Sequence, residues 1–268
     1  MPASDGARRE RNPIAAVVRL LGALAEHDGA TAGVRELARM LGAAPSSVQR
    51  TLEAAQEVSL VALAENGQWE LGWELYRIAA IAQSKRPYQA AAAVLDALAK
   101  QTAETALLTV YDPQRRARMF VAASPSRHSV RFVPDLFTWM PAYAGASATA
   151  ILAFRPEAEQ DAVRAAADAF SAFAAAPDPT DLKAALQQIR ERGYAISHDE
   201  VNLGASAVAA PVRSSSGAIT SSVAVIAPNQ RFDQASQEAV ITSVVEAANA
   251  VSRRIGDPLA PLEVVADS

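Results

Sequence analysis

Residues 34–61, VRELARMLGAAPSSVQRTLEAAQEVSLV, place two short amphipathic helical patterns in close succession, and this pairing strongly restricts the possible folds. The apolar residues of the first pattern recur at the spacing of one helix face: Val34, Leu37, Ala38 and Leu41. Gly42 interrupts that pattern, and Pro45, a residue favoured at the first position of a helix, begins the next one. The core side of the second helix carries Val48, Leu52 and Ala55. The pattern predicts two helices joined by a tight turn.

The other faces of the second helix are polar and carry Ser46, Ser47, Gln49 and Arg50. In a helix-turn-helix pair the second helix lies in the major groove of DNA, with its N-terminal residues at the base edges. Serine hydroxyls suit phosphates, glutamine suits adenine, and arginine suits guanine or phosphate. The competing interpretation is a solvated helix face of no special function, since helical hairpins with a glycine turn are common.

The elements around this pair favour the DNA-binding interpretation. A preceding helix is predicted from Asn12 and Pro13, a cap and a first helical residue, to Gly29. Two short strands around an Asn-Gly hairpin turn are predicted at 60–63 and 68–71. Three helices followed by a small hairpin form a winged helix-turn-helix arrangement.

A proline marks the predicted domain junction. An amphipathic helix over 73–83 leads to Pro87, which pushes the residue before it out of the helical region. We therefore expect a winged helix-turn-helix domain with its linker helix at 12–86 and a second domain at 87–256. The tail at 257–268 has little to bury and is expected to be flexible.

The second domain interleaves strand patterns with long helical ones. Strands are predicted at 106–111, 119–123, 129–133, 194–197, 205–213 and 218–226. Helices are predicted at 88–102, 145–154, 156–174, 180–192 and 233–255. Such a mixture gives an α+β domain whose sheet has helices on one or both faces. The predicted fold class is mixed α/β, with an N-terminal winged helix-turn-helix domain and a C-terminal α+β domain.

Composition excludes several chemistries. The chain contains no cysteine, so it has no disulfide, no thiolate nucleophile and no cysteine-based metal site. The three histidines, His27, His128 and His198, show no metal-ligand spacing, and we expect no cofactor. No apolar run is long enough for a signal peptide or a membrane span, so we expect a cytoplasmic protein with no membrane partner. Because the net charge is -4, any DNA-binding surface must be local.

A serine hydrolase is an alternative that the sequence only weakly supports. The segments GASAT (145–149) and GASAV (204–208) approach the Gly-x-Ser-x-Gly elbow of α/β-hydrolases. Both lack the second glycine that the strained turn needs. His198 beside Asp199 would complete a Ser-His-Asp set, but polar residues in turns are commoner than triads. We therefore expect no enzymatic activity.

Longer segments resemble the IclR-type bacterial transcription regulators over about residues 12–255. VRELARMLGAAPSSVQRTL is similar to their helix-turn-helix signature, and WELGWEL (69–75) to the motif that leads into their linker helix. Similar C-terminal segments are ETALLTVYD, MPAYAGASATAILAF and IRERGYAISHDEVNLGASAVAAPVRSSSGAITSSVAV. The resemblance implies a ligand-responsive DNA-binding regulator with a GAF-like effector-binding domain.

The sequence also departs from the family pattern. Tyr143 stands where the family usually has histidine, Ala148 where it has glycine and Thr149 where it has lysine. The recognition helix has one positive charge fewer than is common, so the preferred base sequence is expected to differ from that of relatives.

The resemblance implies an effector pocket between the sheet and the 140–152 segment. Its positions, carried over residue by residue, are Met140, Tyr143, Ala146, Ser147, Ser197, Ala207, Ala224 and Ile226. Backbone N–H groups at a helix N-terminus near Ala146 would meet a carboxylate. Because Ala224 and Ile226 are apolar where relatives often have serine, an aromatic or otherwise apolar carboxylate is expected, with Trp139, Tyr143 or Phe120 packing against its ring. Alternatively, these apolar residues belong only to the core.

The expected partners are double-stranded operator DNA, a small carboxylate effector and further copies of the chain, as a homodimer or homotetramer. The residues predicted to contact DNA are Ser46, Ser47, Gln49, Arg50, Arg35 and a basic arm of Arg8, Arg9 and Arg11. A sensor of the same fold with weak or lost DNA binding is the main alternative. The sequence does not distinguish a repressor from an activator.

Overall fold

The computed structural model describes residues 12–85, 91–167, 177–232 and 234–256. The chain divides into two compact units, Met1–Arg86 and Pro87–Ser268, which are described separately below. The predicted arm residues Arg8, Arg9 and Arg11 and the tail 257–268 lie outside the described residues.

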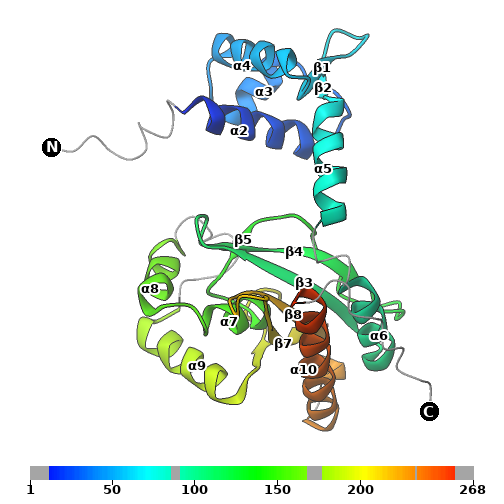
Figure 1. The fold of residues 1–268 in the computed structure, drawn as a ribbon, viewed down its shortest axis with the longest axis vertical. Coiled ribbons are helices and arrows are strands. Elements are labelled where there is room, and N and C mark those ends of the chain that lie inside the picture. The colour runs from blue at the N-terminus through cyan, green and yellow to red at the C-terminus, as the bar shows by residue number, and fades with distance from the viewer. Residues whose placement is uncertain (1–11, 86–90, 168–176, 233, 257–268) are drawn as a thin grey trace, which may run out of the picture. The chain divides into compact units, whose positions relative to one another are not determined.

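In residues 12–85, the described part of the N-terminal unit, there are four helices and a two-stranded antiparallel hairpin (Figure 1). In chain order these are α2 (Pro13–Glu26), α3 (Val34–Leu41), α4 (Pro45–Glu57), β1 (Val61–Leu63), β2 (Trp69–Leu71) and α5 (Trp73–Lys85). Asn12 caps α2, because its side chain accepts the N–H groups of Ile14 and Ala15. The helix-helix-helix-hairpin order is that of a winged helix-turn-helix domain.

One apolar core holds this unit together. Most of the residues predicted to face inward on α3 and α4 are buried in it, with Leu37 and Leu52 both 0% exposed, whereas Val34 and Leu41 are partly buried. Gly42 adopts the left-handed conformation at φ +61°, which turns the chain between the two helices. Ala32 pairs with Trp69 of β2, so the loop after α2 is held against the hairpin.

Helix α2 ends at Glu26, three residues before the predicted end at Gly29. The side chain of His27 provides the reason, because its Nδ1 lies 2.9 Å from the Gly29 nitrogen, whose N–H the neutral ring accepts, and 3.2 Å from the Gly29 carbonyl oxygen, to which the protonated ring donates. On its other side His27 Nε2 lies 3.0 Å from the carboxylate of Glu36 on α3. These two contacts hold the backbone in a loop where the apolar pattern alone allowed another helical turn.

The C-terminal unit is built on one antiparallel sheet with the strand order β5-β4-β3-β8-β7-β6. The strands are β3 (Thr105–Asp112), β4 (Ala117–Ser124), β5 (Met140–Pro141), β6 (Ala195–His198), β7 (Ala205–Arg213) and β8 (Ile219–Pro228). The helices are α6 (Ala92–Thr102), α7 (Ala146–Leu152), α8 (Glu157–Ala165), α9 (Pro179–Arg192), the 3-10 turn η3 (Asn229–Arg231) and α10 (Gln234–Gly256).

Both faces of this sheet are covered, and residue alternation along each strand divides the core in two. On β3, Ala106 and Leu108 pack in the cluster formed with α6 and α10, whereas Leu107 packs in the cluster formed with α7, α8 and α9. The helices lie on the two sides of the sheet in Figure 1. Strands that are buried on both faces have nearly continuous apolar sequences. TALLTVY in β3 and TSSVAVIA in β8 follow this rule, whereas an amphipathic strand would alternate apolar and polar residues.

The strand predicted at 129–133 is absent, and this segment runs as irregular backbone. Side-chain hydrogen bonds replace a ladder there: the Thr105 hydroxyl donates to the Phe132 carbonyl oxygen at 3.0 Å and accepts the Ser126 N–H at 3.1 Å. The short strand β5, which the sequence analysis did not predict, instead pairs with the start of β4. Between the 129–133 segment and β5, Leu136 forms an isolated parallel bridge with Phe120 of β4.

Three predicted helices are shorter within the described residues. Helix α7 covers Ala146–Leu152 rather than 145–154. Helix α6 begins at Ala92 rather than residue 88, and residues 86–90 are outside the described part of the chain. Helix α8 ends at Ala165, where Ala166 closes it, although the alanine-rich pattern predicted a helix over 156–174. Residues 168–176 are again outside the described part.

Candidate functional site

The polar face of α4 is the first candidate site. Ser46, Ser47 and Arg50 are exposed, and Val48 between them is buried in the core at 3% exposure. Arg35 at the start of α3 is also exposed. The helix therefore presents its leading hydroxyls and a cation to solvent while its apolar side anchors it.

Gln49 is the one residue of this face with a side-chain partner on the same helix. Its Nε2 donates to the Glu53 carboxylate at 2.8 Å, and its exposure is intermediate. A base contact by Gln49 would therefore require this bond to open. The N-cap position of α4 is Ala44, whose side chain has no oxygen to accept the first N–H groups of the helix.

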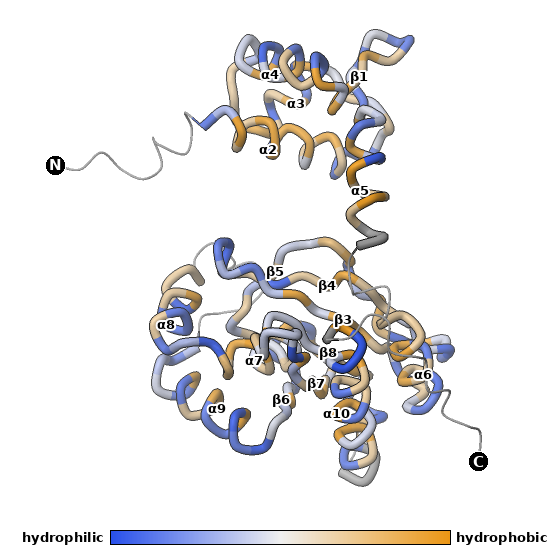
Figure 2. The backbone as a smooth tube through the Cα atoms, viewed as in Figure 1, coloured by the Kyte–Doolittle hydropathy of each residue, from blue (hydrophilic) through white to orange (hydrophobic). Residues whose placement is uncertain are grey.

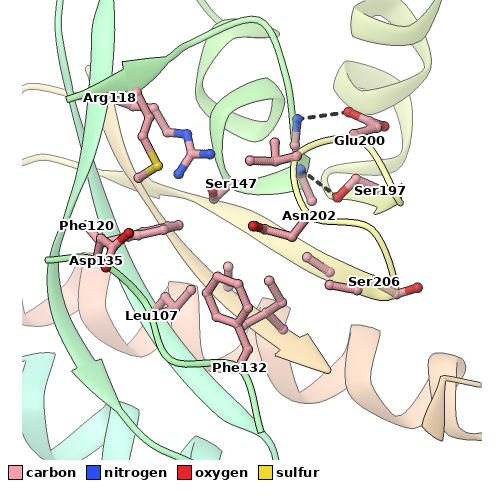
Figure 3. Close-up of a pocket in the computed structure, with 18 of the residues that line it drawn as sticks. Leu107, Arg118, Phe120, Phe132, Asp135, Ser147, Ser197, Glu200, Asn202 and Ser206 are labelled. Carbon is pink, nitrogen blue, oxygen red and sulfur yellow. Dashed lines mark hydrogen bonds between the residues drawn. The ribbon is translucent and has the colours of Figure 1, made fainter. Parts of the chain in front are cut away.

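The second candidate site is a cavity of about 300 Å³ in the C-terminal unit (Figure 3). Its walls come from β3, β4, β5, β6, β7 and β8, from the start of α7, and from the 132–135 and 200–202 loop segments. The apolar wall is continuous across three strands, because Ala224 on β8 is paired with Leu107 on β3, and Ile226 is paired with Ala207 on β7. Phe120 and Phe132 also line the cavity.

Seven of the eight predicted effector positions line this cavity: Met140, Ala146, Ser147, Ser197, Ala207, Ala224 and Ile226. Tyr143 does not, and it is buried in the core at 2% exposure with its hydroxyl directed at the Ala167 carbonyl oxygen, 3.5 Å away. Of the three aromatic residues proposed to pack against a ligand ring, Phe120 alone lines the cavity. Trp139 instead lies under the guanidinium of Arg115, with 5.0 Å from the guanidinium carbon to the ring centroid.

Two backbone N–H groups at the start of α7, the helix end that was expected to bind a carboxylate, have partners within the chain. The Gly145 N–H donates to Glu200 Oε2 at 2.8 Å, and the Ala146 N–H donates to Ser197 Oγ at 3.0 Å (Figure 3). A carboxylate bound at this helix start would therefore share the site with the Glu200 side chain or displace the Ser197 hydroxyl from the Ala146 N–H. The sequence could not show that Glu200, which is 55 residues away, reaches these groups.

Arg118 is a charged residue of the cavity that was not among the predicted effector positions. It lies on β4, two residues before Phe120, and only 2% of its surface is exposed. The Nε donates to the Pro141 carbonyl oxygen at 3.3 Å, and Nη1 has no hydrogen-bond partner. Burial lowers the pKa of its guanidinium to about 10, so Arg118 remains a cation at neutral pH. The available signal was an arginine directly before the mostly apolar strand pattern predicted at 119–123.

The residues of the hydrolase alternative are arranged differently from a triad. The Ser206 hydroxyl donates to Asn229 Oδ1 at 2.6 Å and therefore has no hydrogen left for His198 Nδ1, which lies 2.7 Å away. The Asp199 carboxylate accepts from Asn229 Nδ2 rather than from His198. These bonds fix the loop between β6 and β7 and do not activate a nucleophile.

The described residues contain no group of three or more side chains suited to hold a metal ion. Among the helices of the described part, none is both long and apolar enough to span a membrane. A winged helix-turn-helix unit followed by an α+β unit is the architecture of a class of DNA-binding transcription regulators.

Comparison with known proteins gives the family. The family described as "Bacterial transcriptional regulator IclR C-terminal" matches residues 80–253, and the "IclR helix-turn-helix domain" matches residues 15–65. The chain belongs to the IclR family of DNA-binding transcription regulators, and the matched families and relatives are regulators rather than enzymes.

Individual relatives are distant in sequence. The probable HTH-type transcriptional regulator ArcR of Halobacterium salinarum is 24% identical over 258 residues, which are 94% of this chain and 97% of that protein. The structure of an IclR transcriptional regulator from Alicyclobacillus acidocaldarius has a TM-score of 0.75 at 24% identity, covering 91% of this chain and 98% of that one. An IclR homologue from Microbacterium hydrocarbonoxydans, solved in complex with 4-hydroxybenzoate, has a TM-score of 0.74 at 19% identity, covering 91% and 99%.

Proposed function

We propose that this chain binds operator DNA through α4 and that a small organic carboxylate, bound in the cavity of the C-terminal unit, changes its affinity for that DNA. The observation that carries the proposal is the cavity itself. It lies within the domain that defines the family, and an apolar wall and several polar side chains face the same space. Such a combination is typical of small-molecule sites.

The contact surface for DNA is the exposed face of α4, together with Arg35 on α3. Ser46, Ser47 and Arg50 stand free of the core on the leading turns of the helix. Because no side chain caps the α4 N-terminus, a DNA phosphate is a suitable partner for its first N–H groups. Arg50 then reads a guanine or a phosphate, and Gln49 reads adenine after releasing Glu53.

An aromatic or otherwise apolar carboxylate fits the cavity better than a small keto acid. The wall formed by Leu107, Ala224 and Ile226 offers no hydrogen-bonding atom to a polar ligand group. The structural neighbour from Microbacterium hydrocarbonoxydans was solved with an aromatic carboxylate, which supports the proposal at the level of ligand class.

A homo-oligomer completes the proposal. Helices α2 and α5 of the N-terminal unit each expose more than one large apolar residue: Ile14 (73%) and Val18 (50%) on α2, and Trp73 (83%), Tyr76 (53%), Ile78 (47%) and Ile81 (44%) on α5. Figure 2 shows the apolar residues of α5 along much of its length. Exposed apolar surface of this kind marks interaction sites, and a palindromic operator needs paired recognition helices. Light scattering after gel filtration measures the oligomeric state.

A two-stage experiment tests the function. The purified protein is first screened by thermal unfolding against benzoates, phenylacetates, fatty acids and keto acids, since a ligand of the native state raises the melting temperature. DNA fragments are then selected from the source genome on the immobilised protein, and their affinity is measured with and without the hits. Specific DNA binding that no stabilising carboxylate alters would favour a different effector class, whereas a ligand-binding protein that selects no DNA would favour the sensor without DNA binding.

A further inference from the structure

The polar end of the cavity contains a buried cation without a counterion. Arg118 is 2% exposed, and it forms no ion pair with any residue that the structure describes. Nη1 has no hydrogen-bond partner, although Nε is bonded to the Pro141 carbonyl oxygen. Buried charges in proteins are almost always paired or ligand-bound, because leaving water is costly for them. Without a ligand, the Arg118 guanidinium therefore lacks both a counterion and a hydrogen-bond partner for Nη1.

The surroundings hold this guanidinium in place and direct it into the cavity. Its central carbon lies 4.7 Å from the ring centroid of Phe120, so the cation stacks against an aromatic wall. A Cβ built on Gly145 would lie 3.6 Å from Nη2, which places the group beside the start of α7. In Figure 3 the Arg118 side chain extends from β4 toward the middle of the lining residues.

The two acidic residues of the cavity do not neutralise this cation. Glu200 uses Oε2 to accept the Gly145 N–H, and both Glu200 and Asp135 are exposed residues at the cavity. Neither carboxylate lies within ion-pairing distance of Arg118. An incoming anion would thus meet one buried positive group and two carboxylates that repel a second negative charge.

We propose that Arg118 binds the carboxylate of the effector and makes the cavity selective for organic monoanions with an apolar body. This inference rests on the proposed function and adds the residue and the charge state that define the ligand. Planar guanidinium groups match carboxylates with two parallel hydrogen bonds. The apolar body then extends along Leu107, Ala224 and Ile226. Neutral amides of the same shape leave the cation unpaired, and dicarboxylates bring an extra charge to Glu200 and Asp135.

Calorimetry with benzoate and benzamide tests the proposal on the wild-type protein. These probes share a ring and nearly the same volume but differ in charge. We expect benzoate to bind roughly 10- to 100-fold more tightly than benzamide, as a charge-assisted pair would produce. The affinity for benzoate should be nearly constant from pH 6 to pH 9, because benzoate stays an anion and the Arg118 guanidinium stays mostly a cation over this range. Equal binding of benzamide overturns the inference without any variant.

Substitution then assigns the selectivity to Arg118. Arg118→Met should abolish the preference for benzoate over benzamide, and Arg118→Lys should retain part of it. Arg115→Met removes the same charge from the exposed turn before β4, outside the cavity lining, and should leave both affinities unchanged. Benzoate affinity of Arg118→Met equal to that of the wild type overturns the inference and leaves the proposed function intact.

Thermal unfolding separates ligand binding from a structural role. Removing an unpaired buried charge should leave the melting temperature of ligand-free Arg118→Met equal to or above that of the wild type. Benzoate should raise the melting temperature of the wild type and of Arg115→Met, but not that of Arg118→Met. A lower melting temperature of ligand-free Arg118→Met, with benzoate stabilisation preserved, contradicts the assignment. Failure of benzoate, phenylacetate and hexanoate alike to bind the wild type would instead reject the proposed carboxylate sensing.

Discussion

The carbonyl oxygen of Ser59 occupies the space where a side chain on residue 72 would begin. A Cβ built on Gly72 would lie 2.1 Å from that oxygen, closer than any real contact. Gly72 also donates its N–H to the Leu60 carbonyl oxygen at 2.9 Å, which fixes the hairpin to the end of α4. The glycine of the WELGWEL segment is thus required by close packing of two backbones rather than by an unusual φ angle.

Gly72→Ala should destabilise the N-terminal unit by more than about 2 kcal/mol, because backbone must move to admit one methyl group. Gly22→Ala is the matched control. Gly22 lies within α2 and a Cβ there would meet nothing within 4 Å, so this change should stabilise the helix slightly. Urea unfolding followed by circular dichroism measures both. Equal stability of the two variants would show that the hairpin tolerates the displacement.

The His27–Glu36 pair makes the stability of the N-terminal unit depend on pH. Hydrogen bonding to Glu36 raises the pKa of His27 above 6.5, and the same bond lowers the pKa of Glu36 below 4.5. The histidine contribution is therefore fully present below pH 6.5 and is lost as pH rises through the folded pKa. The glutamate contribution is present above pH 4.5 and is lost as pH falls through its own folded pKa.

Nuclear magnetic resonance titration of the His27 ring measures this directly. Glu36→Gln should bring the pKa of His27 down toward 6.5, whereas Glu74→Gln, in an ion pair with Arg77 on α5, should leave it unchanged. A His27 pKa that does not respond to Glu36→Gln would mean that the pair is not formed in solution.

Arg50→Ala should weaken binding to the selected operator by ~1–3 kcal/mol if the guanidinium makes a bidentate contact to guanine. A phosphate contact would instead weaken all sequences equally and lower the salt dependence of binding. Arg77→Ala is the control, because Arg77 is engaged with Glu74 on α5 and lies outside the α4 face. Fluorescence anisotropy on specific and scrambled duplexes distinguishes these outcomes, and an unchanged affinity removes Arg50 from the interface.

Ala224→Ser should narrow the preference of the cavity for benzoate over glyoxylate. Ala224 is 1% exposed and lines the apolar wall, where a polar ligand group without a partner would cost ~1–3 kcal/mol. An aromatic ring there gains roughly 25 cal/mol per Å² of apolar surface removed from water. Ala148 lies on α7 outside the cavity lining, so Ala148→Ser is the control and should leave the preference for benzoate unchanged. Tighter binding of glyoxylate than benzoate by the wild type would contradict the apolar character assigned to the cavity.

Local patterns predicted most of the fold. Helix positions such as Pro45 and the Gly42 turn follow from propensities that act within a few residues, and the strand pattern at 205–213 matches β7 as the structure has it. Errors occurred where side chains override the pattern. His27 stops α2 early, and Thr105 holds the 129–133 segment out of the sheet.

The candidate site could be predicted only in part, for the same reason. Ala207, Ala224 and Ile226, which line the cavity, could be predicted because the resemblance to the family matches pocket positions residue by residue along the sequence. The partners of the α7 N–H groups and the lack of a counterion for Arg118 depend on residues that are distant in sequence and meet only in the folded protein. A chain-local pattern carries no information about such contacts.

The central claim is that occupancy of the cavity alters DNA affinity. A labelled duplex carrying the selected operator is titrated with protein, first alone and then with the best carboxylate from the thermal screen at saturating concentration. Coupling between two sites is typically 1–3 kcal/mol, so the dissociation constant for DNA should change by roughly 5- to 150-fold. A dissociation constant that stays the same while calorimetry shows the cavity to be filled would contradict the account.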